Sequence, residues 1–201
     1  MTKLSRIIAV ATLALMATAS PALATRGEKA HPVPFKGSVL ALDNGQIFPT
    51  PEEPLDCPEG AEWQFFSRGT GQVSHLGRST LDLIQCSKYV EFPFVGQSEG
   101  TTAFTAANGD KLVLAHDLTF DVFIGVFLPD GTPVPDGFEG SGTWTVLEGS
   151  GRFANATGSG TITVLGDVPT DDTPMFDLPA GGTLWTFSGM IAYDASNRSN
   201  H

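Results

Sequence analysis

The stretch LWTFSGMIAY, residues 184–193, decides the fold class of this chain. Large apolar residues alternate there with small or polar ones, in the order Trp185, Thr186, Phe187, Ser188 and then Ile191, Ala192, Tyr193. A period of two is the signature of a β-strand with one buried face. We therefore predict a strand over 183–194 whose aromatic residues face a core.

A second stretch, TFDVFIGVFL at 119–128, is apolar on both faces. Phe120 and Val122 lie on one face of such a strand, and Phe123 and Phe127 lie on the other. A strand with two apolar faces must be covered on both. We expect a packed or ligand-filled interior on one side. A second layer or a neighbouring subunit of a homo-oligomer would cover Phe123 and Phe127 on the other side.

Short runs rich in Val, Thr, Phe and Trp recur along the rest of the chain, separated by Gly and Pro. This punctuation is typical of strands joined by turns, and no long helical pattern follows the N-terminus. The segments 43–60 and 167–182 are expected to be inserted loops. The spacing indicates an antiparallel sandwich or barrel, with strands near 36–42, 61–69, 73–86, 101–106, 111–117, 119–128, 142–148, 159–166 and 183–194.

The N-terminus has the pattern of a secretory signal peptide. Lys3 and Arg6 precede a short apolar run, and Ala22-Leu23-Ala24 supplies the small residues that signal peptidase recognises. The run is short for a membrane span, and a retained anchor is the alternative. We expect residues 1–24 to be removed and the mature protein to be soluble and exported, periplasmic or extracellular, without a stable membrane anchor.

The length and the net charge of the mature chain limit the number of domains and the kinds of partner. Of 201 residues, 177 remain after residue 24, which suits one domain. We place a flexible lead-in at 25–35, a single domain at 36–194 and a disordered tail at 195–201. Without Lys3 and Arg6 the 11 basic residues fall to 9 against 22 acidic ones, a net charge of −13. Such a surface repels phosphate backbones, so nucleic acid and anionic membranes are poor partners.

Four motifs follow one another along the chain: GTGQVSHLGRST (69–80), FTAANGDKL (104–112), GSGRFANATGSGTI (149–162) and FSGMIAY (187–193). Their order and spacing resemble those of secreted bacterial proteins with an allene oxide cyclase-like barrel. The resemblance covers roughly 36–194 and implies an eight-stranded antiparallel β-barrel with a central cavity, related in shape to dirigent proteins. The matching residues belong to turns and strands, so no catalytic residue is carried over.

A barrel with an aromatic interior suggests two classes of function. The first is a module that binds a small apolar molecule, with Trp144, Trp185, Phe187 and Tyr193 as the cavity wall. The second is a cyclase or isomerase that folds a hydrophobic substrate in the same cavity, which requires no conspicuous motif. A barrel filled by its own side chains, acting as an interaction protein, is a third reading. Whether the protein is an enzyme stays open.

Two residues could supply acid–base chemistry. His116 lies on the face of Leu112, Leu114 and Leu118, where a lone histidine is more often a hydrogen-bonded core residue than a proton donor. Asp82 would have a raised pKa if it faced inward, but the barrel exterior is its more frequent environment. The sequence has no metal-ligand spacing, and we expect neither a metal nor a cofactor.

The cysteines Cys57 and Cys86 are expected to form a disulfide in an oxidising compartment. The midpoint of their numbers lies between Gly71 and Gln72. A two-residue turn there would place glycine where a type II′ turn needs a positive φ. That register would pair Trp63 with Thr80 and bring the cysteines opposite each other on neighbouring strands.

Overall fold

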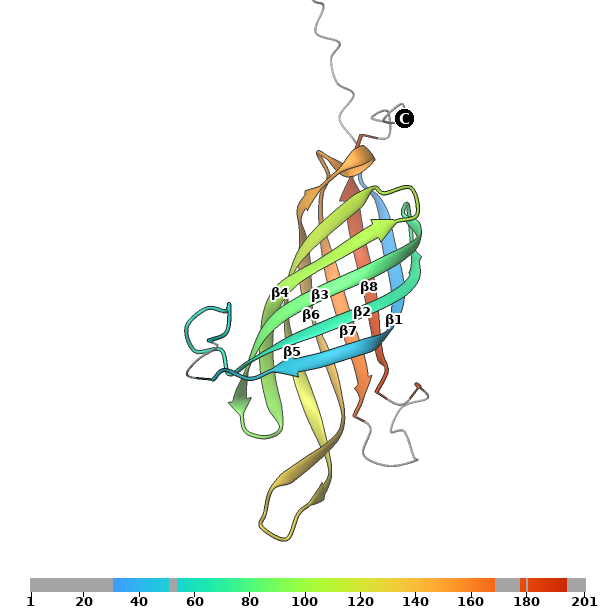
Figure 1. Cartoon of the computed structure of the whole chain (residues 1–201). Helices are drawn as coiled ribbons and strands as arrows, with labels where there is room; N and C mark the ends of the chain where they lie inside the picture. Colours follow the sequence, from blue (N-terminus) through green and yellow to red (C-terminus); the bar gives the residue numbers. More distant parts are fainter. Residues whose placement is uncertain (1–30, 51–53, 169–177, 180, 195–201) are drawn as a thin grey trace, which may run out of the picture.

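The computed structural model of the chain describes residues 31–50, 54–168, 178–179 and 181–194. Eight antiparallel strands close into a barrel in which each strand pairs with its neighbours along the chain, and the last pairs with the first (Figure 1). The strands are β1 (Val33–Ile47), β2 (Trp63–Val73), β3 (Gly77–Glu91), β4 (Val95–Ala106), β5 (Lys111–Phe127), β6 (Pro133–Gly149), β7 (Thr157–Asp167) and β8 (Thr183–Ala192). The predicted all-β, eight-stranded antiparallel barrel is confirmed.

The strand count differs from the prediction in one place. The two strands expected at 111–117 and 119–128 are a single strand, β5, because the alternation of buried and exposed residues runs through Asp117 and Leu118 without a break. Strand β1 also begins at Val33, so Phe35 belongs to the core. The predicted signal peptide and C-terminal tail lie outside the described residues. In the described part of the chain, no helix is long and apolar enough to cross a membrane.

The turn between β2 and β3 differs from the predicted register. Val73 pairs with Gly77, and Trp63 pairs with Ser87 instead of Thr80, so the chain reverses at Ser74–Leu76 and not at Gly71-Gln72. His75 adopts a φ of 67°, which the turn requires, and its Nε2 lies 2.8 Å from the carbonyl oxygen of Pro34. Glycines 69 and 71 continue the strand. The predicted hairpin register is therefore wrong.

One end of the barrel, the upper end in Figure 1, is filled by aromatic side chains. Phe35 packs edge-on against Trp144 with 5.2 Å between ring centroids, and Phe104 packs edge-on against Phe187 at 4.9 Å. The short helix η1 (Gly151–Phe153) closes this end with the fully buried ring of Phe153. Buried aromatic pairs in this arrangement stabilise beyond the area that they bury.

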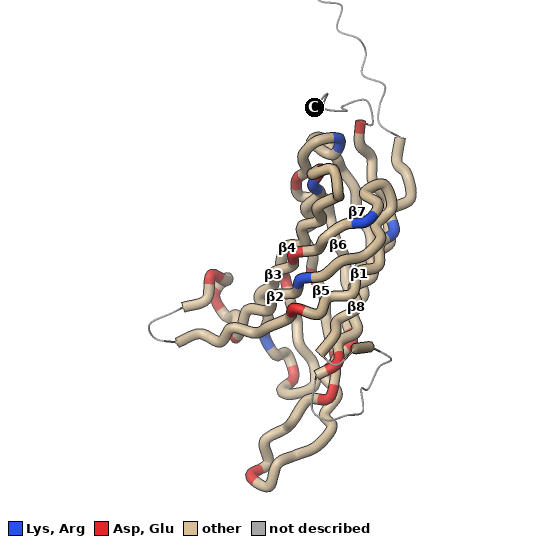
Figure 2. Tube along the Cα trace, turned by 45° about the vertical axis from the view of Figure 1, so that its right-hand side comes forward, with Lys and Arg blue, Asp and Glu red and all other residues tan. Residues whose placement is uncertain are grey.

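Charged residues are distributed unevenly along the barrel (Figure 2). Asp and Glu predominate at the lower end, whereas most Lys and Arg lie in the upper half. On the outer wall between the two ends, Arg68 forms ion pairs with Asp43 at 3.8 Å and Asp82 at 3.2 Å. The lower end is therefore the more acidic one.

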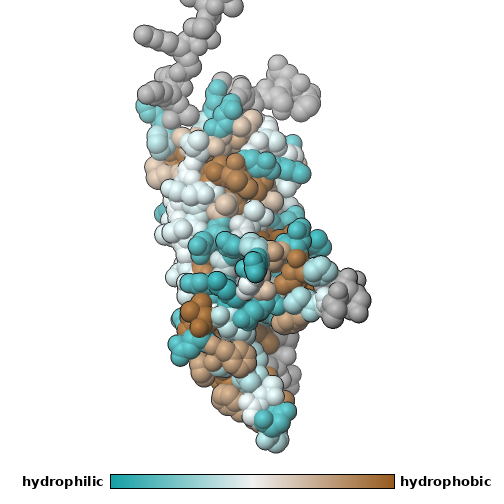
Figure 3. All heavy atoms as spheres, turned by 90° about the vertical axis from the view of Figure 1, so that its left-hand side faces the viewer, coloured by the Kyte–Doolittle hydropathy of each residue, from teal (hydrophilic) through white to brown (hydrophobic). Residues whose placement is uncertain are grey.

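The lower end extends into protruding hairpins with exposed apolar residues. The β5–β6 hairpin projects beyond the barrel, and Phe127 at its tip is 60% exposed, whereas Phe123 is partly buried (Figure 1). Phe92 and Phe94 in the β3–β4 hairpin are also exposed. Apolar atoms form separate patches among hydrophilic ones on the face seen in Figure 3. The cover that a second subunit would give Phe127 stays a prediction, which sedimentation would test.

Candidate ligand-binding cavity

A cavity of about 280 Å³ opens within the lower end of the barrel. It is walled mainly by aromatic and aliphatic side chains from β2, β3, β5, β6 and β7, and none of the described residues that line it is Asp, Glu, Lys, Arg or His. Ligand sites have this character, an apolar concavity with few polar groups. The lining residues are Gln46, Trp63, Phe65, Tyr89, Leu118, Phe120, Val122, Pro135, Gly137, Phe138, Val164 and Val168.

The cavity wall is built from rings that lie opposite glycines. Phe120 on β5 pairs with Gly96 on β4, and Phe138 on β6 pairs with Gly166 on β7. A Cβ atom at either glycine would collide with the facing ring. Glycine therefore lets each ring lie flat against the neighbouring strand, which keeps the ring in the wall and leaves the centre open.

Tyr89 contributes a hydroxyl group at the cavity. It is the last cavity-lining residue of β3 before the β3–β4 turn, and its ring packs against Trp63 at 4.8 Å and Phe92 at 5.1 Å between centroids. The backbone N–H of Tyr89 donates to the carboxylate of Glu62 at 3.4 Å. Burial, and then the negative charge of Glu62, raise the pKa of Tyr89 above its usual value. The phenol therefore stays protonated and can donate a hydrogen bond at neutral pH.

A layer of polar side chains lies next to the cavity, one inward-facing position further up the strands. Ser87 and Ser98 hydrogen-bond each other at 2.7 Å, and His116 lies 3.1 Å from the Thr102 hydroxyl and 3.2 Å from the Gln85 carbonyl oxygen. These five residues are buried. These side chains come from the neighbouring strands β3, β4 and β5 and satisfy one another's hydrogen bonds beside the cavity.

The predicted acid–base candidates lie away from the cavity. Burial lowers the pKa of His116 to about 4, so the ring is neutral near pH 7. Its Nε2–H then donates to Gln85, and its Nδ1 accepts from Thr102. Asp82 lies on the outer face with its side chain 58% exposed and paired to Arg68. Neither residue lines the cavity, and no group of three His, Cys, Asp or Glu suited to a metal occurs among the described residues.

The four residues that the sequence suggested as cavity wall lie elsewhere in the barrel. Trp144 and Phe187 are buried in the packed upper half, and the ring of Tyr193 packs at a tilt against Phe153 at 4.8 Å between centroids at the closed end. Trp185, the third residue of β8, is fully buried and pairs with Val164 of the cavity wall. Trp185 donates its indole N–H to the Ser67 hydroxyl at 2.9 Å. None of the four lines the cavity.

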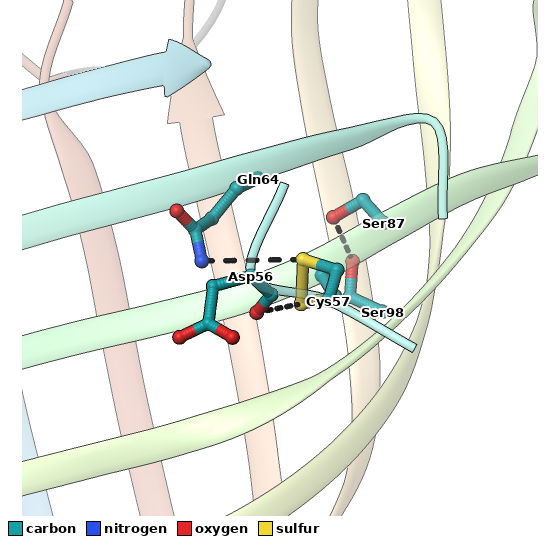
Figure 4. The surroundings of a disulfide bond; sticks show 6 residues. Asp56, Cys57, Gln64, Ser87 and Ser98 are labelled. Carbon is teal, nitrogen blue, oxygen red and sulfur yellow. Dashed lines mark hydrogen bonds between the residues drawn. A yellow bond between two sulfur atoms is a disulfide. The ribbon is translucent and has the colours of Figure 1, made fainter. Parts of the chain in front are cut away.

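The predicted disulfide between Cys57 and Cys86 is confirmed, but the two cysteines do not lie opposite each other on paired strands (Figure 4). Cys86 lies on β3, opposite Gln64 of β2, whereas Cys57 belongs to the loop that precedes β2. The bridge therefore fastens this loop to the barrel wall instead of joining two paired strands. The loop leads directly into Trp63, a cavity residue, so the bridge helps to fix one edge of the mouth.

No family model, curated protein or solved structure matches the chain.

Proposed function

We propose that the protein binds a small, uncharged, mainly apolar molecule in the lower cavity. The observation that carries the proposal is an open cavity of about 280 Å³ walled mainly by aromatic and aliphatic side chains, with no charged residue among the described residues that line it. An apolar cavity of about 150 Å³ holds benzene. A cavity of this size suits a ligand of about ten to fifteen non-hydrogen atoms, such as a bicyclic hydrocarbon skeleton.

Titration with aminonaphthalene, a neutral dye whose emission depends on polarity, tests the proposal. We expect saturable binding with a blue shift of the dye emission, because the dye leaves water for an apolar wall. Val122→Trp adds bulk to a half-buried wall residue and should weaken binding at least tenfold. Val126→Trp is the matched control, since Val126 lies on the same strand, is exposed and does not line the cavity. Absence of dye binding by the folded protein would overturn the proposal.

The proposal also covers where the protein is located and which class of barrel it belongs to. We infer an exported protein of the allene oxide cyclase-like class; the eight-stranded antiparallel barrel and the disulfide support this assignment. Amino-terminal sequencing of the protein recovered from outside the cytoplasm should begin at Thr25. A mature chain that still begins at Met1 would contradict the export signal.

A further inference from the structure

The polar groups of the cavity are concentrated at its mouth. Among the described residues that line the cavity, Gln46, Tyr89 and Trp63 carry a polar side-chain group, which in Trp63 is the indole N–H. Gln46 is exposed near the end of β1, and Tyr89 is half-buried near the β3–β4 turn. No group among the described residues hydrogen-bonds to the Tyr89 hydroxyl, so it is available to a ligand.

The inner end of the cavity offers no such group. Leu118 and Val164 form its wall there, and both are buried. The nearby serines 87 and 98 bond each other, and His116 is engaged by Thr102 and Gln85. A ligand with a polar group at its inner end would leave that group without a partner, which is costly in an apolar site. The apolar part of a ligand therefore belongs inside, and any polar group belongs at the mouth.

The charge around the cavity is acidic. Among the described residues that adjoin a lining residue in sequence, Lys88 is the only basic one. The acidic residues so placed are Glu62, Asp117, Asp121, Asp136, Glu139 and Asp167. Figure 2 shows the same excess of Asp and Glu at this end. The summed field of these charges disfavours an anion at the mouth and is indifferent to a neutral group.

We infer that the cavity takes a neutral amphiphile, bound with its apolar body inside and one uncharged hydrogen-bonding head group, such as a hydroxyl or carbonyl, against Tyr89 at the mouth, and that it rejects the corresponding carboxylate. This inference rests on the proposed function and adds the orientation and the charge class of the ligand. Tyr89 acts here as the residue that selects the head group.

A matched set of naphthalene derivatives tests the inference by displacement of bound aminonaphthalene at neutral pH. Ethylnaphthalene has no head group, naphthylethanol has a hydroxyl, naphthylacetic acid is ionised, and its methyl ester is neutral. We expect the alcohol and the ester to bind at least tenfold more tightly than the carboxylate. Tyr89→Phe should weaken the alcohol about fivefold, the effect of one hydrogen bond, and leave ethylnaphthalene unchanged.

A pair of charge variants tests the role of the acidic mouth. Glu62→Gln removes the carboxylate beside Tyr89 and should bring the affinities of the acid and the alcohol two- to threefold closer. Asp130→Asn is the control, because Asp130 is an exposed acid in the β5–β6 turn that adjoins no lining residue. It should leave the ratio unchanged.

The outcomes separate this inference from the proposed function. Carboxylate binding as tight as that of the alcohol would overturn the inference while cavity binding stands. Equal weakening of all ligands by Tyr89→Phe would reduce Tyr89 to a wall residue and would also overturn the inference. If the dye and ethylnaphthalene both fail to bind the folded protein, the proposed function fails and the inference fails with it.

Discussion

In the upper half of the barrel Trp144 lies opposite Gly160, and in the lower half Phe120 lies opposite Gly96, the same cross-strand pairing of a ring with a glycine. Above, rings from different walls meet, as Phe35 and Trp144 do at 5.2 Å, and fill the interior. Below, rings on opposite walls lie farther apart, with 6.3 Å between the centroids of Trp63 and Phe120 and 6.2 Å between those of Phe65 and Phe138, and a cavity remains. A glycine opposite a ring allows the ring to lie close to the neighbouring strand. Whether the interior is filled or contains a cavity depends on the side chains on the opposite wall of the barrel.

The two halves also end differently. Phe153 and Tyr193 close the upper end, where η1 brings a ring over the barrel. At the lower end β5 and β6 continue past the barrel, and Phe127 and Phe92 are exposed to solvent. We therefore propose that the upper half mainly stabilises the barrel and that the lower half binds the ligand.

Truncation of one aromatic ring in each half should give the largest difference in stability between the two halves. In the upper half, Phe35→Ala removes a fully buried ring and should lower the free energy of unfolding by about 3–5 kcal/mol. Phe138→Ala removes a half-buried ring beside a cavity and should cost about 1–2 kcal/mol while weakening dye binding strongly. Urea denaturation measures both losses. Equal losses at the two sites would mean that the halves are packed alike.

Loss of the disulfide should have the next largest effect. The bridge spans a separation of 29 residues, and the double variant Cys57→Ser, Cys86→Ser should lose about 3–4 kcal/mol of stability in the chain-entropy model. Since the bridge anchors the loop before Trp63, dye binding should weaken while near-ultraviolet circular dichroism from the fully buried Trp144 and Trp185 persists. Unchanged affinity in the double variant would show that the loop does not shape the mouth.

Acid should destabilise the polar layer beside the cavity. The pKa of His116 is about 4 in the folded protein, against about 6.5 in an unfolded chain, so the unfolded state binds the proton more readily. The contribution of His116 to stability is fully present above pH 6.5 and falls as the pH drops towards 4, by about 3 kcal/mol in total.

The matched variant for the acid experiment is His116→Gln, which keeps a polar side chain at the same position. The stability difference between wild type and His116→Gln should shrink or reverse between pH 6.5 and 4. A difference that does not change over this range would show that His116 titrates normally, as would an imidazole NMR titration with a midpoint near 6.5.

The fold could be predicted from the sequence better than the site could. Alternation along 184–193 and the Gly and Pro punctuation predict an all-β chain because one-sided burial is a local property of a strand. The cavity depends on which ring meets which across the lumen, and that requires the register. The sequence predicts the β2–β3 turn at Gly71-Gln72 because glycine is common in turns. In the structure Gly71 instead lies in β2 close to the backbone of β1, and His75 in the actual turn has the positive φ.

The missed cavity residues did carry a signal in the sequence. Trp63 and Phe65 alternate like Trp185 and Phe187, so both pairs read equally well as inward-facing aromatics. No local feature of the sequence distinguishes a ring that fills the barrel interior from a ring that lines a cavity. The acid–base candidate Asp82 was ambiguous for the same reason, because its face follows from the register of β3.

Intermolecular nuclear Overhauser effects between bound ethylnaphthalene and the methyl groups of the protein test most directly the claim that the lower half binds ligand and the upper half does not. We predict contacts from the ligand to the methyl groups of Leu118, Val122 and Val164, which line the cavity. We predict none to those of Ile162 and Ile191, which are fully buried in the core and do not line it. Contacts to Ile162 or Ile191 without contacts to Leu118, Val122 and Val164 would contradict this account.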